Sequence, residues 1–297
     1  MAATLLDTPD HASASLAITG VCMNYRITLL LGVISVAATG CFVPEDAKAG
    51  VRLGNEVASK FVFRGMTQVD APVYQPRIAI ALPTIHGDQV RISTLANMDL
   101  TNDNGDAWFP QGHAGRFSAI DFRVAYEKQL GSWCQVSTGI FGYNLPNGQE
   151  FPNDGRGGPG EERGGTSEVF FTVSANVLEA TPYFSWHYDF DEVHGAYYRG
   201  GLTESFQIND TWNVVLDGSL GYATSAQSDW LYDLDKSGFA DLRGKVVVNY
   251  QYDDRTTLTA GLHGSSMQNN ALDQWFNDVG VPNDDPIWVS LGVNWTF

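Results

Sequence analysis

Charged side chains recur at every second position along many segments of this 297-residue chain. Residues 115–130 are typical, because Asp121 and Arg123 have one parity whereas Phe122 has the other. On an extended strand this alternation places the ionisable groups on one face and the apolar groups on the opposite face. Opposite charges on one face of a sheet pair across strands and also contact polar solutes. The chemistry indicated is ion pairing and solute contact.

The same polar parity holds bases and acids in nearly equal number. The bases are Lys60, Arg64, Arg77, Arg91, Arg123, Arg199, Arg243 and Lys245. The acids are Asp99, Asp121, Glu127, Glu168, Glu179, Asp217 and Asp241. These residues are predicted to line a common interior in which the charges neutralise one another.

The whole chain is nevertheless strongly acidic, with 34 acids against 17 bases and a net charge of −17. Most of the excess lies in the long connections between alternating segments. This acidity excludes nucleic acid as a partner, because phosphate binding needs a basic face. An acidic rim favours a weak preference for cations at low salt in a conducting pore. The alternative is a basic ladder of arginines from the first four segments, which would select anions.

Twelve alternating segments predict twelve strands. They lie near 55–66, 76–85, 89–100, 115–130, 133–144, 165–176, 179–189, 194–206, 211–223, 238–252, 256–266 and 286–297. Short connections alternate with long ones rich in Asp, Asn, Gly and Pro, apart from the short connection 190–193. Short turns at one end and long loops at the other are typical of transmembrane up-and-down antiparallel β-barrels. A soluble sandwich is the alternative, but it would have shorter strands and no such asymmetry.

Hydropathy and aromatic residues agree with a barrel in lipid. The mean hydropathy is −0.16, which excludes a bundle of membrane helices but suits strands with one apolar face. Trp133, Trp212 and Trp295 fall at the turn ends of strands, whereas Trp186 falls near the opposite end. Two aromatic girdles mark the two membrane interfaces of such barrels. We therefore expect residues 50–297 to form an outer-membrane β-barrel embedded in lipid.

The N-terminal part has the pattern of an export signal. Residues 23–49 begin with Arg26, continue with a short apolar stretch and end in small residues, as secretory signal peptides do. Residues 1–22 lack this character and indicate an over-extended gene start or a disordered extension. Two cleavage sites compete: a lipoprotein-like box would lipidate Cys41, whereas Ala47-Lys48-Ala49 suits ordinary signal peptidase.

A family resemblance rests mainly on residues 57–70, which read Val-Ala-Ser-Lys-Phe-Val-Phe-Arg-Gly-Met-Thr-Gln-Val-Asp. This segment resembles the opening strand of the TorF-like (Gcw-chp) family of bacterial outer-membrane proteins. Weaker similarity occurs at residues 167–169, 182–189 and 195–198. The resemblance implies an outer-membrane barrel and supplies no catalytic residues.

Two further clusters suggest other chemistry. Asp233, Asp235 and Ser237 precede Gly238 as in the first half of a calcium loop, but Gly244 stands where a bidentate acid is required. The alternative is a polar loop entering a strand. His263 and Ser265 share the polar parity, yet no nucleophile motif surrounds them, so the sequence does not predict an enzyme.

Two functions remain open at this point. The polar, charge-lined interior favours a narrow channel for small hydrophilic solutes or ions that needs no cofactor. The alternative is a non-conducting structural or surface-binding barrel, in which interlocked charges fill the lumen and acidic loops bind divalent cations or a partner. Arginines that close contacts with acids across the lumen would favour the second function.

Overall fold

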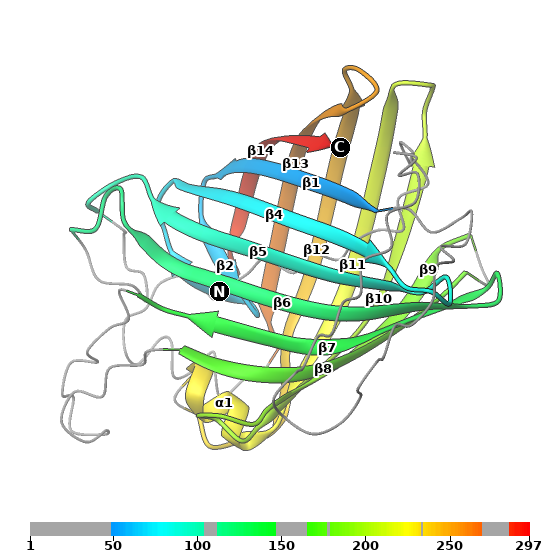
Figure 1. Ribbon diagram of the computed structural model, residues 1–297. Coiled ribbons are helices and arrows are strands. Elements are labelled where there is room, and N and C mark those ends of the chain that lie inside the picture. Colours follow the sequence, from blue (N-terminus) through cyan, green and yellow to red (C-terminus); the bar gives the residue numbers. More distant parts are fainter. Residues whose placement is uncertain (1–48, 104–111, 147–164, 177–178, 233, 269–284) are drawn as a thin grey trace.

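The computed structural model describes residues 49–103, 112–146, 165–176, 179–232, 234–268 and 285–297. Within these ranges twelve antiparallel strands form a closed barrel, and one short helix packs at one end (Figure 1). None of the helices in this part of the chain is both long enough and apolar enough to cross a membrane. The expected signal peptide, its cleavage sites and Cys41 lie outside the described residues.

The elements follow one another in chain order around the wall. They are β1 (Gly50–Ala58), β2 (Phe61–Phe63), β3 (Met66–Val69), β4 (Val73–Pro83), β5 (Gln89–Asp99), β6 (Phe117–Leu130), β7 (Cys134–Asn144), β8 (Gly165–Ala175), β9 (Thr181–Asp189), β10 (Ala196–Gln207), β11 (Trp212–Ala223), α1 (Ser225–Tyr232), β12 (Gly238–Gln251), β13 (Thr256–Met267) and β14 (Ile287–Thr296). Each wall strand pairs with its two neighbours, and β1 pairs with β14 to close the barrel.

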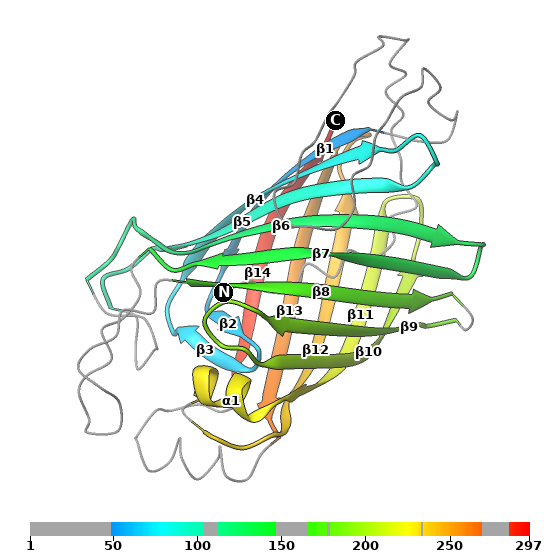
Figure 2. The ribbon, with the colours of Figure 1, turned by 60° about the horizontal axis from the view of Figure 1, so that its bottom comes forward.

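The hairpin β2–β3 does not belong to the wall. β1 pairs directly with β4, so that Ala58 lies opposite Val73 although fourteen residues separate them in the chain. The intervening hairpin forms a separate two-stranded sheet. It lies inside the barrel, near the end that carries α1 (Figure 2).

The two faces of the wall differ as the alternation predicts. Leu291, Leu262 and Phe122 point outward and expose 67%, 52% and 50% of their surface, because no protein covers the outer face. Glu168 and Asp241 point inward and are buried. An apolar exterior around a polar interior is the arrangement that a hydrocarbon environment requires.

The predicted fold is confirmed in number of strands, strand direction and alternation of connections. Short turns join the strands at 84–88, 131–133, 176–180, 208–211 and 252–255, and the remaining connections meet at the opposite end. We call these the turn end and the loop end. In the turn 252–255, Asp253 Oδ1 accepts hydrogen bonds from the backbone N–H groups of Arg255 and Thr256, both at 2.8 Å.

The prediction for the first strand was wrong. Residues 55–66 were expected to form one continuous strand, but β1 ends at Ala58 and the chain then turns into the lumen. The apolar alternation of Phe61, Val62 and Phe63 suits the inner hairpin as well as a wall strand. The observed β1 begins earlier, at Gly50, and uses the weaker alternation of residues 50–58.

Candidate functional site

The inner hairpin is buried along its whole length. Every residue from Phe61 to Val69 is buried, on both faces of the two short strands. Its tip is a two-residue turn in which Arg64 and Gly65 have φ angles of 44° and 89°. Two consecutive positive φ values are typical of the tight turns that join twisted hairpin strands. For an arginine this conformation is sterically unfavourable, so its surroundings must stabilise it.

Arg64 finds that stabilisation on the opposite wall. Its Nη2 donates hydrogen bonds to both carboxylate oxygens of Glu168 on β8, at 2.7 and 2.8 Å. The side chains of the pair are 4% and 1% exposed, so water is excluded from the contact. The guanidinium carbon also lies 4.3 Å from the centre of the Tyr197 ring, within the range of a cation–π interaction.

Glu168 is the centre of a larger network. Tyr143 Oη donates a hydrogen bond of 2.8 Å to its Oε2, and His187 Nδ1 lies 3.1 Å from the same oxygen. Tyr232 of α1 holds the other side of the tip, where its hydroxyl donates to the backbone carbonyl of Arg64 at 2.6 Å. The hairpin is thus fixed both by its side chain and by its backbone.

Gly65 brings the tip into contact with two more wall strands. A Cβ atom at this position would lie 2.6 Å from Met267 Sδ and 2.7 Å from Asp241 Cβ. Only glycine allows this approach, and its positive φ adds a second reason for glycine here. The hairpin therefore starts between β1 and β4 and reaches across the lumen to β8, β12 and β13.

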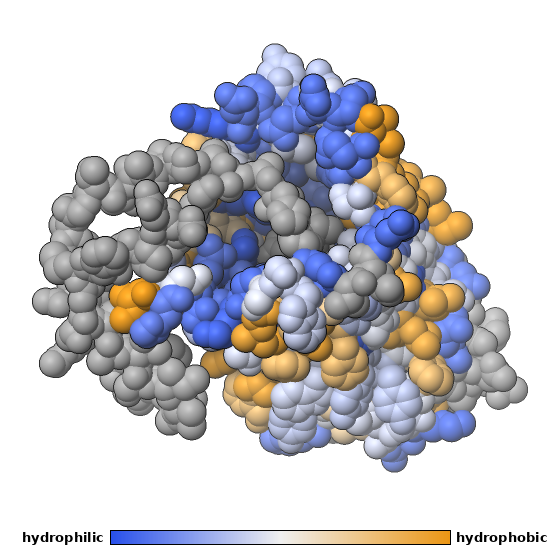
Figure 3. Space-filling model, turned by 90° about the vertical axis from the view of Figure 1, so that its right-hand side faces the viewer, coloured by the Kyte–Doolittle hydropathy of each residue, from blue (hydrophilic) through white to orange (hydrophobic). Residues whose placement is uncertain are grey.

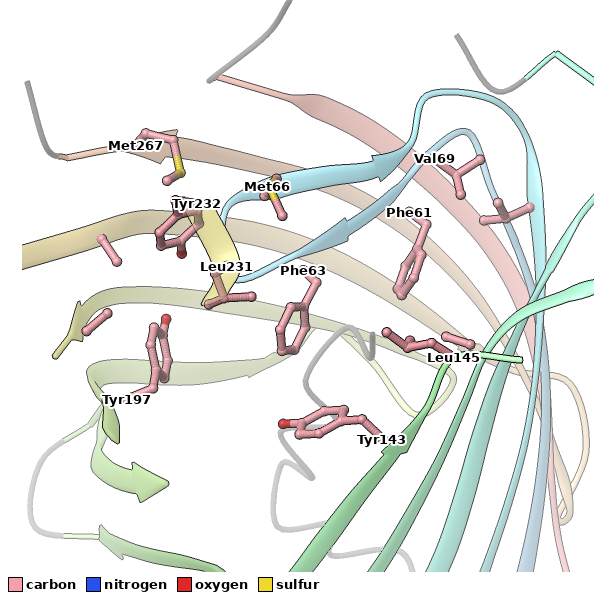
Figure 4. Close-up of a cluster of buried hydrophobic side chains, with 14 of the residues drawn as sticks. Phe61, Phe63, Met66, Val69, Tyr143, Leu145, Tyr197, Leu231, Tyr232 and Met267 are labelled. Atoms are coloured by element: carbon pink, nitrogen blue, oxygen red, sulfur yellow. The ribbon is translucent and has the colours of Figure 1, made fainter. Parts of the chain in front are cut away.

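An apolar cluster surrounds the hairpin at the loop end. Phe61, Phe63, Met66 and Val69 pack against side chains from the wall and from α1 (Figure 4). The wall and helix contribute, among others, Tyr143, Leu145, Tyr197, Leu231, Tyr232 and Met267. This end of the interior is packed like the core of a soluble protein, because apolar side chains fill it and exclude water.

A second ionic group adjoins the tip. Arg243 Nε lies 2.7 Å from Asp241 Oδ2, and Tyr197 Oη donates a hydrogen bond of 2.5 Å to Asp241 Oδ1. Arg199 donates to the same tyrosine oxygen at 2.9 Å. Tyr197 therefore contacts both networks, through its ring to Arg64 and through its hydroxyl to Asp241.

The turn end of the interior is polar. Arg77 pairs with Glu56 at 2.9 Å, and Arg91 pairs with Glu127 at 3.0 Å. Arg123 donates to Ser137 at 3.2 Å. The face seen in Figure 3, at the right-hand side of Figure 1 where the short turns lie, has hydrophilic residues around a hollow and hydrophobic residues on the outer wall. Water reaches this half of the lumen.

Most of the predicted lumen residues lie inside the barrel, with three differences. Lys60 and Arg64 belong to the inner hairpin and its approach instead of a wall strand, and Lys60 pairs with Asp70. Glu179 lies in the turn before β9 and is exposed, because β9 begins only at Thr181. The prediction that Glu179 lines the lumen was therefore wrong. The remaining predicted side chains point inward from wall strands: Arg77, Arg91, Asp121, Arg123, Glu127, Glu168, Arg199, Asp217, Asp241, Arg243 and Lys245.

The other candidate chemistry is only partly covered. His263 Nε2 lies 3.0 Å from Ser290 Oγ rather than from Ser265, and the imidazole stacks on Trp288. In the described ranges no carboxylate contacts His263, so the pair lacks the acid that orients a catalytic histidine. No group of three or more metal-binding residues occurs in the same ranges.

The calcium prediction is not tested. Asp233 lies outside the described residues, Asp235 is exposed, and Ser237 Oγ accepts a hydrogen bond from the backbone N–H of Ser225 at 2.8 Å.

Sequence reasoning missed the residues that hold the hairpin from the side. Tyr143, Tyr197 and His187 contact Arg64 or Glu168, yet each was assigned only to an alternating strand. Their inward parity was readable from the sequence. The missing information was the presence of a hairpin inside the barrel for them to contact.

Comparison with known proteins gives the fold a context. No family model and no curated protein matches the chain. Among solved structures, an outer membrane channel from Pseudomonas putida F1 is similar with a TM-score of 0.50 and 7% identity, over 86% of this chain and 99% of that one. The NanC porin has a TM-score of 0.48 and 13% identity, over 83% and 98% of the two chains. The KdgM porin in complex with disordered oligogalacturonate has a TM-score of 0.45 and 9% identity, over 84% and 99%. The fold is that of bacterial outer-membrane barrels.

Proposed function

We propose that this chain is a narrow outer-membrane channel for small hydrophilic solutes or ions, with the inner hairpin β2–β3 as its barrier. The observation that carries the proposal is the polar inner face, which continues from the turn end up to the hairpin. A twelve-stranded barrel is wider than the filled eight-stranded barrels, so its lumen has room for solutes where no inner segment occupies it. The hairpin is the segment that decides whether solutes pass.

The position of the barrier follows from its contacts. Arg64 and Gly65 touch the wall on the far side of the lumen, and the apolar cluster fills the space around them. Solutes that enter at the turn end meet this packed layer. Passage therefore requires displacement of the hairpin, and the Arg64–Glu168 pair opposes that displacement.

The alternative is a non-conducting structural barrel, and one observation favours it. The Arg64–Glu168 pair crosses the lumen and the hairpin is buried on both faces, as expected for a permanent plug. The other ion pairs described above join neighbouring strands or residues of one strand and do not cross the interior. The two functions thus differ only in whether the hairpin moves.

Recordings in planar bilayers test this proposal. We expect the purified protein to show small openings, and Glu168→Gln to increase the fraction of time in the open state, because Arg64 loses its counter-charge. Glu204→Gln is the matched control, since Glu204 has the outward parity on β10 and lies away from the hairpin. Equal open fractions in both variants would contradict the role of the pair.

A second variant removes the barrier itself. Ala58 and Val73 lie directly opposite each other, so a two-residue Asn-Gly turn in place of residues 59–72 joins β1 to β4 as an ordinary hairpin. We expect a folded barrel with a larger and steadier conductance than the wild type. If neither the wild type nor this folded variant conducts, the chain is a structural barrel.

We propose further that residues 23–49 direct export and that the chain is a member of the TorF-like family. The family motif supports this assignment, because its Arg-Gly pair forms the tip of the hairpin. Calcium binding at Asp233, Asp235 and Ser237 stays a prediction, which calorimetric titration of the purified barrel with Ca²⁺ tests.

A further inference from the structure

Acids and bases inside the barrel differ in how far they reach into the lumen. Six inward-facing bases are partly exposed: Arg52, Arg77, Arg91, Arg123, Arg243 and Lys245. Seven inward-facing acids are buried: Asp99, Asp121, Glu127, Glu168, Asp189, Asp217 and Asp241. Within the described ranges Glu56 is the one inward acid that is partly exposed. The interior is balanced in total charge, but its accessible surface is basic.

The cause is the length of the side chains and the position of their partners. Short carboxylates stay close to the wall, where hydroxyl groups of neighbouring residues bind them. Thr203 donates to Asp217 at 2.6 Å, and Thr166 donates to Asp189 at 2.6 Å. Arginine and lysine instead extend their charged ends away from the backbone toward water. The negative charges are therefore covered, whereas the positive charges face the lumen.

Three of these bases lie around one position. Lys245 is directly opposite His263 in the register of β12 and β13, and Arg243 is two residues away on the same face of β12. His263 lies within electrostatic reach of Lys245, Arg77 and Arg243. Arg77 approaches along the wall over Gly54, where a Cβ atom would lie 2.5 Å from its Cγ. The absence of a side chain at Gly54 thus lets Arg77 lie toward this group.

The carboxylates near this group are already engaged. Glu56 pairs with Arg77, and Asp241 pairs with Arg243. Asp217 faces Lys245 in the strand register but accepts its hydrogen bond from Thr203. No carboxylate among the described residues lies within ion-pair distance of Lys245. The ammonium group of Lys245 is therefore available to a negatively charged solute.

We propose that Arg77, Arg243 and Lys245 form a binding site for a small oxyanion, a carboxylate or a phosphate, on the lumen wall. Guanidinium groups bind such oxyanions through paired N–H donors, and an ammonium adds a point charge. The site makes anions the solute class of the channel proposed above. Transport of the anion rests on that proposed function, whereas binding does not require conduction.

Ion selectivity tests the inference where the barrel conducts. Reversal potentials are measured across a KCl gradient with 1 M salt on the more concentrated side, where screening over about 3 Å removes the influence of distant loops. We expect the wild type to prefer chloride. Lys245→Gln should lower the chloride-to-potassium permeability ratio at least about twofold, and Glu56→Gln should raise it. Preference for potassium, or no preference, would overturn the inference.

Lys128→Gln is the matched control, because Lys128 points away from the lumen and pairs with Asp88 at the turn end. It removes the same charge from the protein without changing the lumen. We expect the permeability ratio of the wild type in this variant. An equal loss of selectivity in Lys128→Gln and Lys245→Gln would contradict a local site.

Calorimetric titration with inorganic phosphate tests the site independently of conduction. We expect the refolded wild type and Lys128→Gln to bind phosphate equally, and Lys245→Gln and Arg77→Gln to bind it about tenfold more weakly. Circular dichroism and electrophoretic mobility verify that each variant is folded. Binding by a barrel that never conducts would refute the channel and support the site. Conduction without anion preference or phosphate binding would refute the site and leave the channel.

Discussion

The two halves of the barrel interior contain the same kinds of residue in different physical environments. At the loop end, Arg64 and Glu168 form an ion pair of 2.7 Å whose side chains are 4% and 1% exposed. At the turn end, Arg77 and Glu56 form a pair of 2.9 Å whose side chains are 23% and 19% exposed. Their lengths are nearly equal, but water reaches only the second. The comparison teaches that the role of a lumen charge depends on the segment that covers it.

The largest expected difference comes from removing one carboxylate in each half. Glu168→Ala leaves Arg64 charged and buried, which should lower the free energy of unfolding by about 3–5 kcal/mol. Glu56→Ala leaves Arg77 in contact with water and should cost about 1–2 kcal/mol. Urea titrations of the barrel folded into lipid vesicles measure both. Similar losses would mean that water reaches both halves alike.

Charges introduced into the wall sharpen the contrast between the wet lumen and lipid. Val124→Arg and Phe171→Arg place a charge on the lipid face, at a cost of about 2–4 kcal/mol near mid-wall. Thr172→Arg places the same group in the lumen beside Ser185 and should be much milder. Folding titrations into bilayers compare the three variants. Equal costs would show that inward and outward faces were assigned wrongly.

Glycines at the hairpin tip and on the outer wall provide a smaller test. Gly65→Ala should destabilise the barrel by at least about 1–2 kcal/mol, because the residue has φ +89° and its Cβ atom would contact Met267. Gly264→Ala is the control, since a Cβ atom there meets nothing within 4 Å. The difference in urea midpoint between the variants measures the effect. A Gly65→Ala barrel as stable as the control would mean that the tip is loosely held.

The smallest effect concerns pH at the turn end. Hydrogen bonds from the backbone N–H of Arg255 hold the pKa of Asp253 below its ordinary value of 3.8. Its contribution to stability is therefore complete above that value and is lost as the pH falls through the lower pKa of the folded protein. Asp253→Asn keeps an acceptor and does not titrate. The stability difference between wild type and this variant should change only below pH 3.8, and a change centred near pH 6 would point to histidine.

The wall was predictable from the sequence because its signal repeats. Alternation along β6, β8 and β12 identifies strands and faces, and the lengths of the connections identify the two ends. These features depend only on contacts with lipid and water, which act on every strand alike. The sequence reading therefore found twelve strands and their direction without knowledge of any particular contact.

The hairpin was not predictable on the same grounds. Residues 61–69 are apolar on both faces, and the alternation that indicates a wall strand continues into β2 without a break. The signal that was available is the Arg64-Gly65 pair between two apolar triplets, which resembles a tight hairpin turn. Which charges become buried could not be read either, because burial of Glu168 depends on Arg64, which lies 104 residues earlier in the chain.

The seam between β1 and β14 has a consequence for the assembly of the protein. Ring closure joins the first wall strand to the last, and the tip of the hairpin touches β8, β12 and β13. The N-terminal hairpin thus waits for partners that are synthesised much later. Contacts between such distant parts of a chain slow folding, because a long loop must close before any of them form. The barrel must close around its own N-terminal segment, so insertion into the membrane and filling of the interior are a single event in its biogenesis.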